Sequence, residues 1–265
     1  MARREKLWKM RNLKLTLAYD GADFHGWQVQ PGCRTVQGTL AAALARIVGP
    51  PAEDELPQGA GRTDAGVHAL AQVALCQTNS PIPAANLKIA LNDALPPAIR
   101  VLAIEEAPAD FHPRASARAK TYRYRIFREA ICPPFLARYV YHHPYPVDEA
   151  AMSVAAAAVI GKRDFTSFAA VDAERSARLK EGEVNNVREI FASVWERQGE
   201  ELVYTVRGSG FLHHMVRNLV GTFLLVGKGT LRAGDVARIV AAQNRTANPG
   251  ATAPASGLYL VGVEY

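Results

Sequence analysis

One glycine-rich segment, residues 59–69, carries a single carboxylate. It reads Gly-Ala-Gly-Arg-Thr-Asp-Ala-Gly-Val-His-Ala, so Asp64 lies two residues after Arg62 and four before His68. Glycines let a backbone turn tightly and approach a ligand closely. A carboxylate on such a loop beside a cation stays ionised and can act as a nucleophile. Asp64 is therefore the first candidate for a catalytic residue, and a tight turn with Asp64 as its capping residue is the alternative.

A second candidate lies in the segment Leu-His-His-Met-Val-Arg-Asn at 212–218. Apolar residues at helical spacing predict that this segment opens a helix packed against a core. His213 and Arg217 are four residues apart and share another face of that helix. An arginine there can pair with a buried carboxylate and keep it ionised. The alternative is an ordinary surface arginine.

Residues 111–128 combine positive charge with aromatic rings and contain no acid. The cations are Arg114, Arg118, Lys120, Arg123, Arg125 and Arg128, and the rings are Phe111, His112, Tyr122, Tyr124 and Phe127. Interleaved cations and rings suit a polyanion with stackable bases. The pattern favours nucleic-acid binding and makes Tyr122 a candidate for stacking on a base. A solvated strand face, with Tyr122 as a core tyrosine, is the alternative.

The composition disfavours several other classes of protein. The 265 residues carry a formal net charge of +6, a basic surplus that fits an anionic partner. No apolar run is long enough to span a membrane, and the basic start lacks a signal-peptide core. Three widely spaced cysteines predict reduced thiols in a cytoplasmic protein. No phosphate loop, dinucleotide fingerprint, serine-hydrolase elbow or metal-ligand spacing occurs, so neither a metal nor an organic cofactor is expected.

The elements that position these residues are strands and helices in both halves of the chain. Strands are expected over 13–19, 67–77, 99–105, 120–127, 187–196, 201–207 and 258–263, and helices over 36–47, 87–94, 148–160, 212–226 and 234–243. Hairpin-like spacing favours antiparallel pairing. The chain is predicted to be an α+β protein of two similar lobes that share a mixed, mostly antiparallel sheet flanked by helices.

The boundary between the lobes is expected near 107–118, where prolines and charges cluster. This predicts a basic N-terminal extension at 1–10, an N-terminal lobe with the Asp64 loop at 11–110, and a C-terminal lobe at 111–265. Residues 169–186 are polar and irregular, which predicts a loop around Asp172.

Taken together, these motifs resemble those of the tRNA pseudouridine synthases of the TruA family. The similar segments follow that family's order and cover nearly the whole chain. They are Tyr-Asp-Gly at 19–21, Phe-His-Gly-Trp-Gln at 24–28, the Asp64 loop, Phe-His-Pro-Arg at 111–114, Tyr-Arg-Tyr at 122–124, Asp-Phe-Thr-Ser-Phe at 164–168, Phe-Leu-His-His-Met-Val-Arg-Asn at 211–218 and Gly-Leu-Tyr-Leu-Val at 257–261. The family often has Ala or Gly after Phe-His, where this chain has Pro113, which stiffens that loop.

The resemblance implies the pseudouridine synthase fold and the isomerisation of uridine to pseudouridine at positions 38, 39 and 40 of the tRNA anticodon arm. It implies that Asp64 is the nucleophile and that Arg217 is the cation paired with it. Tyr122 then stacks on the target base and can serve as the base for the final proton removal.

The resemblance also implies which residues bind the substrate. Leu258 packs beneath the site, and Arg62 helps to hold the flipped nucleotide out of its stem. Phe111, His112, Arg114 and the loop near 168–172 contact the tRNA. The family works without metal or organic cofactor, and the resemblance implies a homodimer.

The main alternative is a non-catalytic RNA-binding protein of the same fold, in which Asp64 has no chemical role. A phosphotransferase with an aspartate nucleophile needs further carboxylates near Asp64, and none follows in sequence before Asp93. The sequence leaves open which of the three uridines is preferred, and whether Asp64 attacks the ribose C1′ or the uracil C6.

Overall fold

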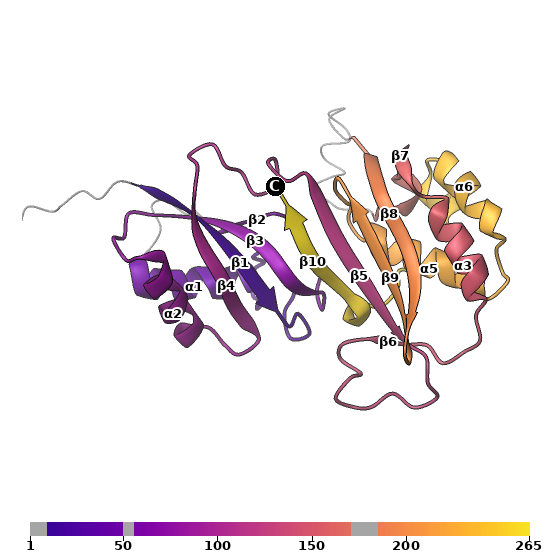
Figure 1. Ribbon diagram of the computed structural model, residues 1–265, viewed down its shortest axis with the longest axis horizontal. Helices are drawn as coiled ribbons and strands as arrows, with labels where there is room; N and C mark the ends of the chain where they lie inside the picture. The colour runs from indigo at the N-terminus through magenta and orange to yellow at the C-terminus, as the bar shows by residue number, and fades with distance from the viewer. Residues whose placement is uncertain (1–9, 50–55, 171–184) are drawn as a thin grey trace, which may run out of the picture. The chain divides into compact units, whose positions relative to one another are not determined.

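The computed structural model describes residues 10–49, 56–170 and 185–265, which form two compact units (Figure 1). The first unit runs to Arg118 and includes Leu260–Tyr265, and the second comprises Ala119–Tyr259. Most of the predicted basic extension and most of the predicted loop around Asp172 lie outside the described residues. Within the described ranges, no helix is long and apolar enough to cross a lipid bilayer.

The first unit is built on a sheet in which β1 pairs antiparallel with both of its neighbours. Its strands are β1 (Arg11–Tyr19), β2 (Gln58–Gly59), β3 (His68–Thr78) and β4 (Ile99–Ala107), together with most of β10 (Leu258–Glu264). The strand order is β4-β1-β3-β10, and β2 pairs with β3. Leu13, Leu15 and Leu17 of β1 are completely buried, which is the two-residue period that predicted this strand.

Two helices of the first unit, α1 (Val36–Val48) and α2 (Ala84–Ala94), contact each other, and α2 packs on β4. α1 begins where the sequence predicts because the Thr35 hydroxyl accepts a hydrogen bond from the N–H of Gly38 at 3.2 Å. It ends at Gly49, whose φ of +88° suits glycine.

The second unit has a sheet in the order β5-β9-β8-β7, with helices against it. Its strands are β5 (Ala119–Phe127), β6 (Tyr141–His142), β7 (Gly161–Asp164), β8 (Val187–Gln198) and β9 (Glu201–Gly208). All pairs along this order are antiparallel, and β6 runs parallel to β5. The pairing is therefore mixed and mostly antiparallel, as predicted.

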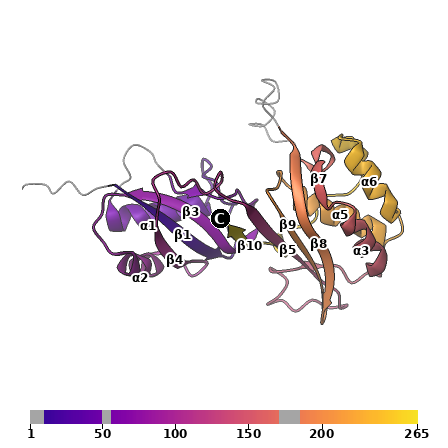
Figure 2. The ribbon, with the colours of Figure 1, turned by 45° about the horizontal axis from the view of Figure 1, so that its top comes forward.

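The helices of the second unit are α3 (Glu149–Ala157), α5 (Met215–Gly227) and α6 (Ala233–Ala241), with the short 3₁₀ turns η1 (Thr166–Phe168), η2 (Arg245–Ala247) and η3 (Ala255–Gly257). Figure 2 shows α3, α5 and α6 on one side of β8. A cluster of Trp195, Tyr204 and Phe223 forms part of the core between them, with the Trp195 and Tyr204 ring centroids 4.9 Å apart. α5 starts at Met215, later than predicted, because His214 has a φ of +57° and cannot continue a helix.

The predicted α+β class is confirmed. β10 takes its first two residues from the second unit and the rest from the first, so one strand contains residues of both units.

Candidate active site

Asp64 lies on the turn between β2 and β3, and its side chain is half-buried. The turn closes with a hydrogen bond from the N–H of Val67 to the carbonyl of Asp64 at 3.1 Å, and Gly66 has a φ of +78°. Just before the turn, the N–H of Ala60 donates to the carbonyl of Val73 on β3 at 2.8 Å. The backbone that carries Asp64 is thereby anchored to the sheet on both sides.

A second segment, residues 19–27, holds the Asp64 turn from outside the sheet. The N–H of Trp27 donates to the carbonyl of Thr63 at 3.0 Å, and the N–H of Gly66 donates to the carbonyl of Phe24 at 3.2 Å. Gly26 permits this close approach, since a Cβ there would come 2.5 Å from the carbonyl oxygen of Thr63. We call residues 19–27 the clamp segment, and it contains two of the motifs on which the family resemblance depends.

Buried side chains hold the turn from within. The hydroxyls of Tyr19 and Thr63 are 2.8 Å apart, so the residue before Asp64 is tied to the end of β1. Gln72, which is completely buried, donates to the carbonyl of Gly61 at 2.8 Å. Burial raises the pKa of Tyr19 to about 12, so its hydroxyl remains neutral at physiological pH.

His68, at the start of β3, is 2% exposed and braces the clamp segment. Its Nδ1 accepts the N–H of Gly21 at 3.1 Å, and an Asp20 carboxylate oxygen lies 3.2 Å from the same nitrogen. The sequence analysis does not single out Gln72 and names Tyr19 and Trp27 only within family motifs, because the roles of all three depend on contacts between segments distant in sequence.

The predicted RNA-contact residues Phe111, His112 and Arg114 form a compact turn after β4. Nδ1 of His112 accepts the N–H groups of Arg114 and Ala115, both at 3.1 Å. The Phe111 ring packs on Tyr265 with centroids 5.0 Å apart. His112 and Arg114 are exposed, as is Arg62 on the Asp64 turn. These side chains are presented to solvent on a fixed backbone.

Pro113, where this chain departs from the family pattern, is buried in that turn. Its carbonyl accepts a hydrogen bond from the Tyr265 hydroxyl at 3.0 Å. The proline therefore contributes to the shape of the turn without entering the exposed face.

Tyr122 lies in the middle of β5 and is 7% exposed. Its ring meets Phe211 edge to face, with centroids 5.0 Å apart and an interplanar angle of 80°. Its degree of burial is that of a core tyrosine, and Phe211 fixes the orientation of the ring.

Arg217 is in the first turn of α5 and is half-buried. Its Nε donates to the carbonyl of Ala253 at 2.7 Å, while the N–H of Ala253 donates to the carbonyl of Arg217 at 3.2 Å. Burial raises the pKa of Tyr124, and the nearby Arg217 charge opposes that rise. Arg217 is thus held in one orientation and is not a freely solvated surface arginine.

The helix that carries Arg217 is fixed by the completely buried Asn218 beside it. Its amide donates to the carbonyl of Phe168 at 2.7 Å, and its carbonyl oxygen accepts from the Thr252 hydroxyl at 2.7 Å. An asparagine suits this buried position because both the N–H and the oxygen of its amide form hydrogen bonds.

Leu258 opens β10 and is 5% exposed. The preceding Gly257 lies so close to β5 that a Cβ there would come 2.8 Å from the carbonyl oxygen of Arg125. The structure therefore places the predicted residues in two sets. Asp64, Arg62, Phe111, His112 and Arg114 belong to the first unit, and Tyr122, Arg217 and Leu258 belong to the second.

Comparison with known proteins identifies the family to which the chain belongs. The sequence model described as tRNA pseudouridine synthase matches residues 16–114 and 155–265. Asp64, Arg217 and Leu258 lie inside those ranges, and Tyr122 lies between them.

Individual relatives cover almost the entire chain. A protein of Solibacter usitatus named tRNA pseudouridine synthase A is 54% identical over 256 residues, which are 97% of this chain and 100% of the relative. Proteins of the same name from Moorella thermoacetica and Halalkalibacterium halodurans are 44% and 43% identical, over 96% and 94% of this chain and 99% and 90% of the relatives. The chain belongs to the tRNA pseudouridine synthase family and is an isomerase that acts on tRNA.

Proposed function

We propose that this enzyme converts uridine to pseudouridine at positions 38, 39 and 40 of the tRNA anticodon arm, with Asp64 as its nucleophile. The observation that carries the proposal is the anchoring of the Asp64 turn. Backbone bonds from Trp27 and to Phe24, with the Tyr19–Thr63 contact, hold one half-buried carboxylate in a fixed place. A nucleophile positioned in advance avoids the entropic cost of finding its reactive geometry.

The reaction leaves the elemental composition of the nucleotide unchanged. A uridine in a stem leaves the stack at a cost of a few kcal/mol before it can react. Asp64 attacks C1′ or C6, the bond between C1′ and N1 breaks, and the base rotates. A new bond forms between C1′ and C5, the bond between Asp64 and the nucleotide breaks and restores the free carboxylate, C5 loses its proton, and N1 gains one. Since the substrate and product are isomers, the balance requires no oxidant or reductant.

The other predicted residues have roles that their surroundings support. In this proposal Arg217 pairs with Asp64, and the bond from its Nε to Ala253 aims the guanidinium group. Tyr122, oriented by Phe211, stacks on the target base and removes the C5 proton. Leu258 is the apolar floor that excludes water while the base is detached.

The substrate-binding surface in this proposal includes Arg62 and the turn of Phe111, His112 and Arg114. Arg62 contacts the RNA and holds the flipped nucleotide out. Nδ1 of His112 accepts hydrogen bonds from two backbone N–H groups, so in the neutral ring Nε2 carries the hydrogen and can donate a hydrogen bond to RNA.

We also propose that the enzyme works in the cytoplasm as a homodimer. Ile131 and Phe135, in the stretch between β5 and β6, are 84% and 92% exposed. Large apolar side chains this exposed, close together in sequence, fit a surface covered by another chain. Light scattering should give a mass near twice 28.7 kDa, and a monomer mass at micromolar concentration would refute the dimer.

The test of Asp64 compares wild-type protein with Asp64→Asn on tRNA whose uridines carry tritium at C5. We expect wild-type protein to release tritium and Asp64→Asn to be slower by on the order of 10³-fold or more, because the amide is no nucleophile. tRNA affinity should change less than about threefold, since the substitution keeps the shape of the side chain.

Equal tritium release by the two proteins would exclude Asp64 as the nucleophile. The non-catalytic alternative predicts no release by either. Release that maps to uridines outside 38–40 would refute the proposed positions while leaving the nucleophile in place.

A further inference from the structure

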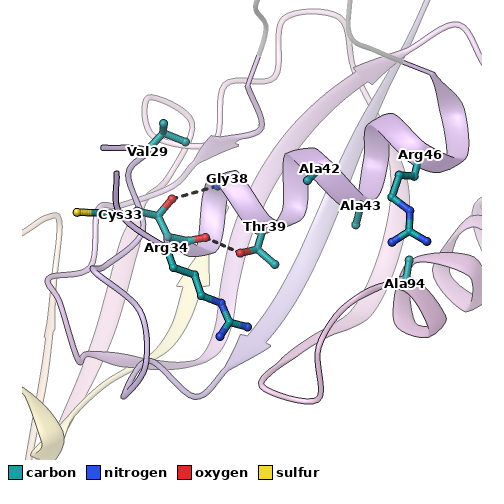
Figure 3. Close-up of a pocket in the computed structure, with 10 residues that line it drawn as sticks. Val29, Cys33, Arg34, Gly38, Thr39, Ala42, Ala43, Arg46 and Ala94 are labelled. Atoms are coloured by element: carbon teal, nitrogen blue, oxygen red, sulfur yellow. Dashed lines mark hydrogen bonds between the residues drawn. The ribbon is translucent and has the colours of Figure 1, made fainter. Parts of the chain in front are cut away.

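The first unit has a pocket of about 400 Å³ beside α1 that the proposed chemistry does not use (Figure 3). Its lining residues come from the segment before α1, from α1 itself and from the end of α2: Val29, Cys33, Arg34, Thr35, Gly38, Thr39, Ala42, Ala43, Arg46 and Ala94. A volume of this size is within the range of pockets that bind ligands.

Both charged groups in the lining are arginines. Arg34 and Arg46 are exposed, and Figure 3 shows their side chains extending from the same side of α1. Neither forms an ion pair with any residue that the structure describes. α1 itself, Val-Gln-Gly-Thr-Leu-Ala-Ala-Ala-Leu-Ala-Arg-Ile-Val, contains no acid. Two guanidinium groups beside a helix without acids are an attractive surface for phosphate oxygens.

The wall between the two arginines is made of small groups. Gly38, Ala42, Ala43 and Ala94 have the shortest side chains of the lining, and the Thr39 hydroxyl donates to the carbonyl of Thr35 at 2.8 Å. Small apolar groups between two cations suit a sugar–phosphate backbone. The carbon faces of its riboses can pack on the wall while its phosphates reach the arginines.

One end of the pocket connects directly to the Asp64 turn. The guanidinium carbon of Arg34 lies 4.8 Å from the centroid of the Phe24 ring, a cation–π contact that holds the side chain. Phe24 in turn accepts the N–H of Gly66 through its carbonyl, and the N–H of His25 donates to the carbonyl of Arg34 at 2.8 Å. Arg34 therefore belongs to the same rigid frame as the candidate nucleophile.

We propose that the α1 pocket binds the sugar–phosphate backbone of the tRNA strand next to the target uridine. The proposal rests on the function proposed above, because it requires the target base to be at Asp64. From Val36 to Arg46 the helix rises about 15 Å at 1.5 Å per residue, and Arg34 lies just before it. Several phosphates of one strand, spaced about 3.4 Å along its axis, fit within that length, so a polynucleotide spans both arginines and a single nucleotide does not.

The first experiment measures tRNA affinity against salt concentration for Arg34→Ala/Arg46→Ala. We expect the dissociation constant to rise about tenfold at physiological ionic strength. The slope of log affinity against log salt should fall by about 1.5 to 2, because each lost phosphate contact removes about one unit or slightly less.

The matched control is Arg163→Ala/Arg238→Ala, which removes the same charge from two exposed arginines on β7 and α6 of the second unit. Its salt slope should change by less than half a unit. Equal slopes for the two double variants would overturn the proposal, since the effect would then be one of net charge alone.

A second experiment uses Cys33, a partly exposed thiol in the pocket wall. Saturating tRNA should slow alkylation of Cys33 by N-ethylmaleimide at least fivefold, both in wild-type protein and in Asp64→Asn. An unchanged rate would overturn the proposal. Equal protection by uridine monophosphate at millimolar concentration would also overturn it, because the pocket would then take a mononucleotide.

The two experiments separate the pocket from the reaction. If wild-type protein releases no tritium yet tRNA protects Cys33, the proposed function fails and the backbone site remains. If tritium is released and neither the salt slope nor the Cys33 rate responds, the function stands and the pocket proposal fails.

Discussion

At the scale of single residues, buried side chains hold the Asp64 turn from below. The Tyr19 hydroxyl contacts Thr63, the neighbour of Asp64, and the amide of Gln72 reaches the carbonyl of Gly61. These buried polar groups are hydrogen-bonded to the turn and restrict it to one conformation. Asp64 is thereby held in position by β1 and β3, in addition to its own turn.

We expect Tyr19→Phe to slow tritium release several-fold under single-turnover conditions without changing tRNA affinity. The lost hydroxyl leaves Thr63 less restrained and should reduce the free energy of unfolding by about 1 kcal/mol. Single-turnover release and urea unfolding measure the two effects.

The matched control is Tyr204→Phe, which removes a buried hydroxyl that lies 2.8 Å from Ser193 in the second unit. Tyr204→Phe should lower the free energy of unfolding by a comparable amount and leave the rate of tritium release unchanged. An equal slowing in both variants would mean that Tyr19 supports the fold in general and does not position the turn.

At the scale of elements, the clamp segment and the Asp64 turn form one unit of local structure. Gly26 has a φ of +80°, and its backbone lies against the carbonyl of Thr63. A larger residue would have to push the turn away or adopt an unfavourable backbone conformation. The geometry of the candidate nucleophile therefore depends on a glycine 38 positions earlier in the chain.

Gly26→Ala should lower the free energy of unfolding by about 2–4 kcal/mol, through strain and through the clash with Thr63. Gly32→Ala provides the control, because Gly32 has a φ of +70° but no atom within 4 Å of the added Cβ. Gly32→Ala should lower the free energy of unfolding by about 1 kcal/mol, through backbone strain alone. Urea unfolding of both proteins measures the difference, and equal losses would show that the clash is relieved without cost.

The elements themselves could be predicted well because their signals are local. Thr35 caps α1 through its own hydroxyl, and β1 buries every second leucine. The start of α5 was predicted too early because apolar spacing does not reveal the positive φ of His214. Asp64 could be singled out from its turn, whereas the roles of Tyr19 and Gln72 in holding that turn could not be predicted, since their partners are distant in sequence.

At the scale of the whole molecule, the stability of the fold should depend on pH through His143. This residue is 2% exposed, and burial lowers its pKa below 6.5, with the charges of Lys228 and Arg128 acting in the same direction. The unfolded chain therefore binds a proton on His143 at a pH where the folded chain does not. Stability should fall as the pH drops below about 6.5 and recover above it.

The measurement is urea unfolding at pH 7.5 and pH 5.5 for wild-type protein and His143→Gln. Glutamine cannot titrate but can still accept a hydrogen bond from Arg128, which lies 3.0 Å from Nδ1 of His143. The loss of stability between the two pH values should be smaller in the variant. An identical loss would assign the pH dependence to other groups.

The division of β10 between the units has a consequence for how the chain is made on the ribosome. β10 is a neighbour of β3 in the first unit, yet the entire second unit is translated between them. At about 5–20 residues per second, synthesis of the residues between β3 and β10 takes many seconds, during which β3 lacks this neighbour. Throughout that interval the part of this edge that β2 does not cover is unpaired, and other nascent chains can join it. Correct pairing in the cell therefore depends on that edge being shielded until β10 emerges, which is a task suited to a chaperone.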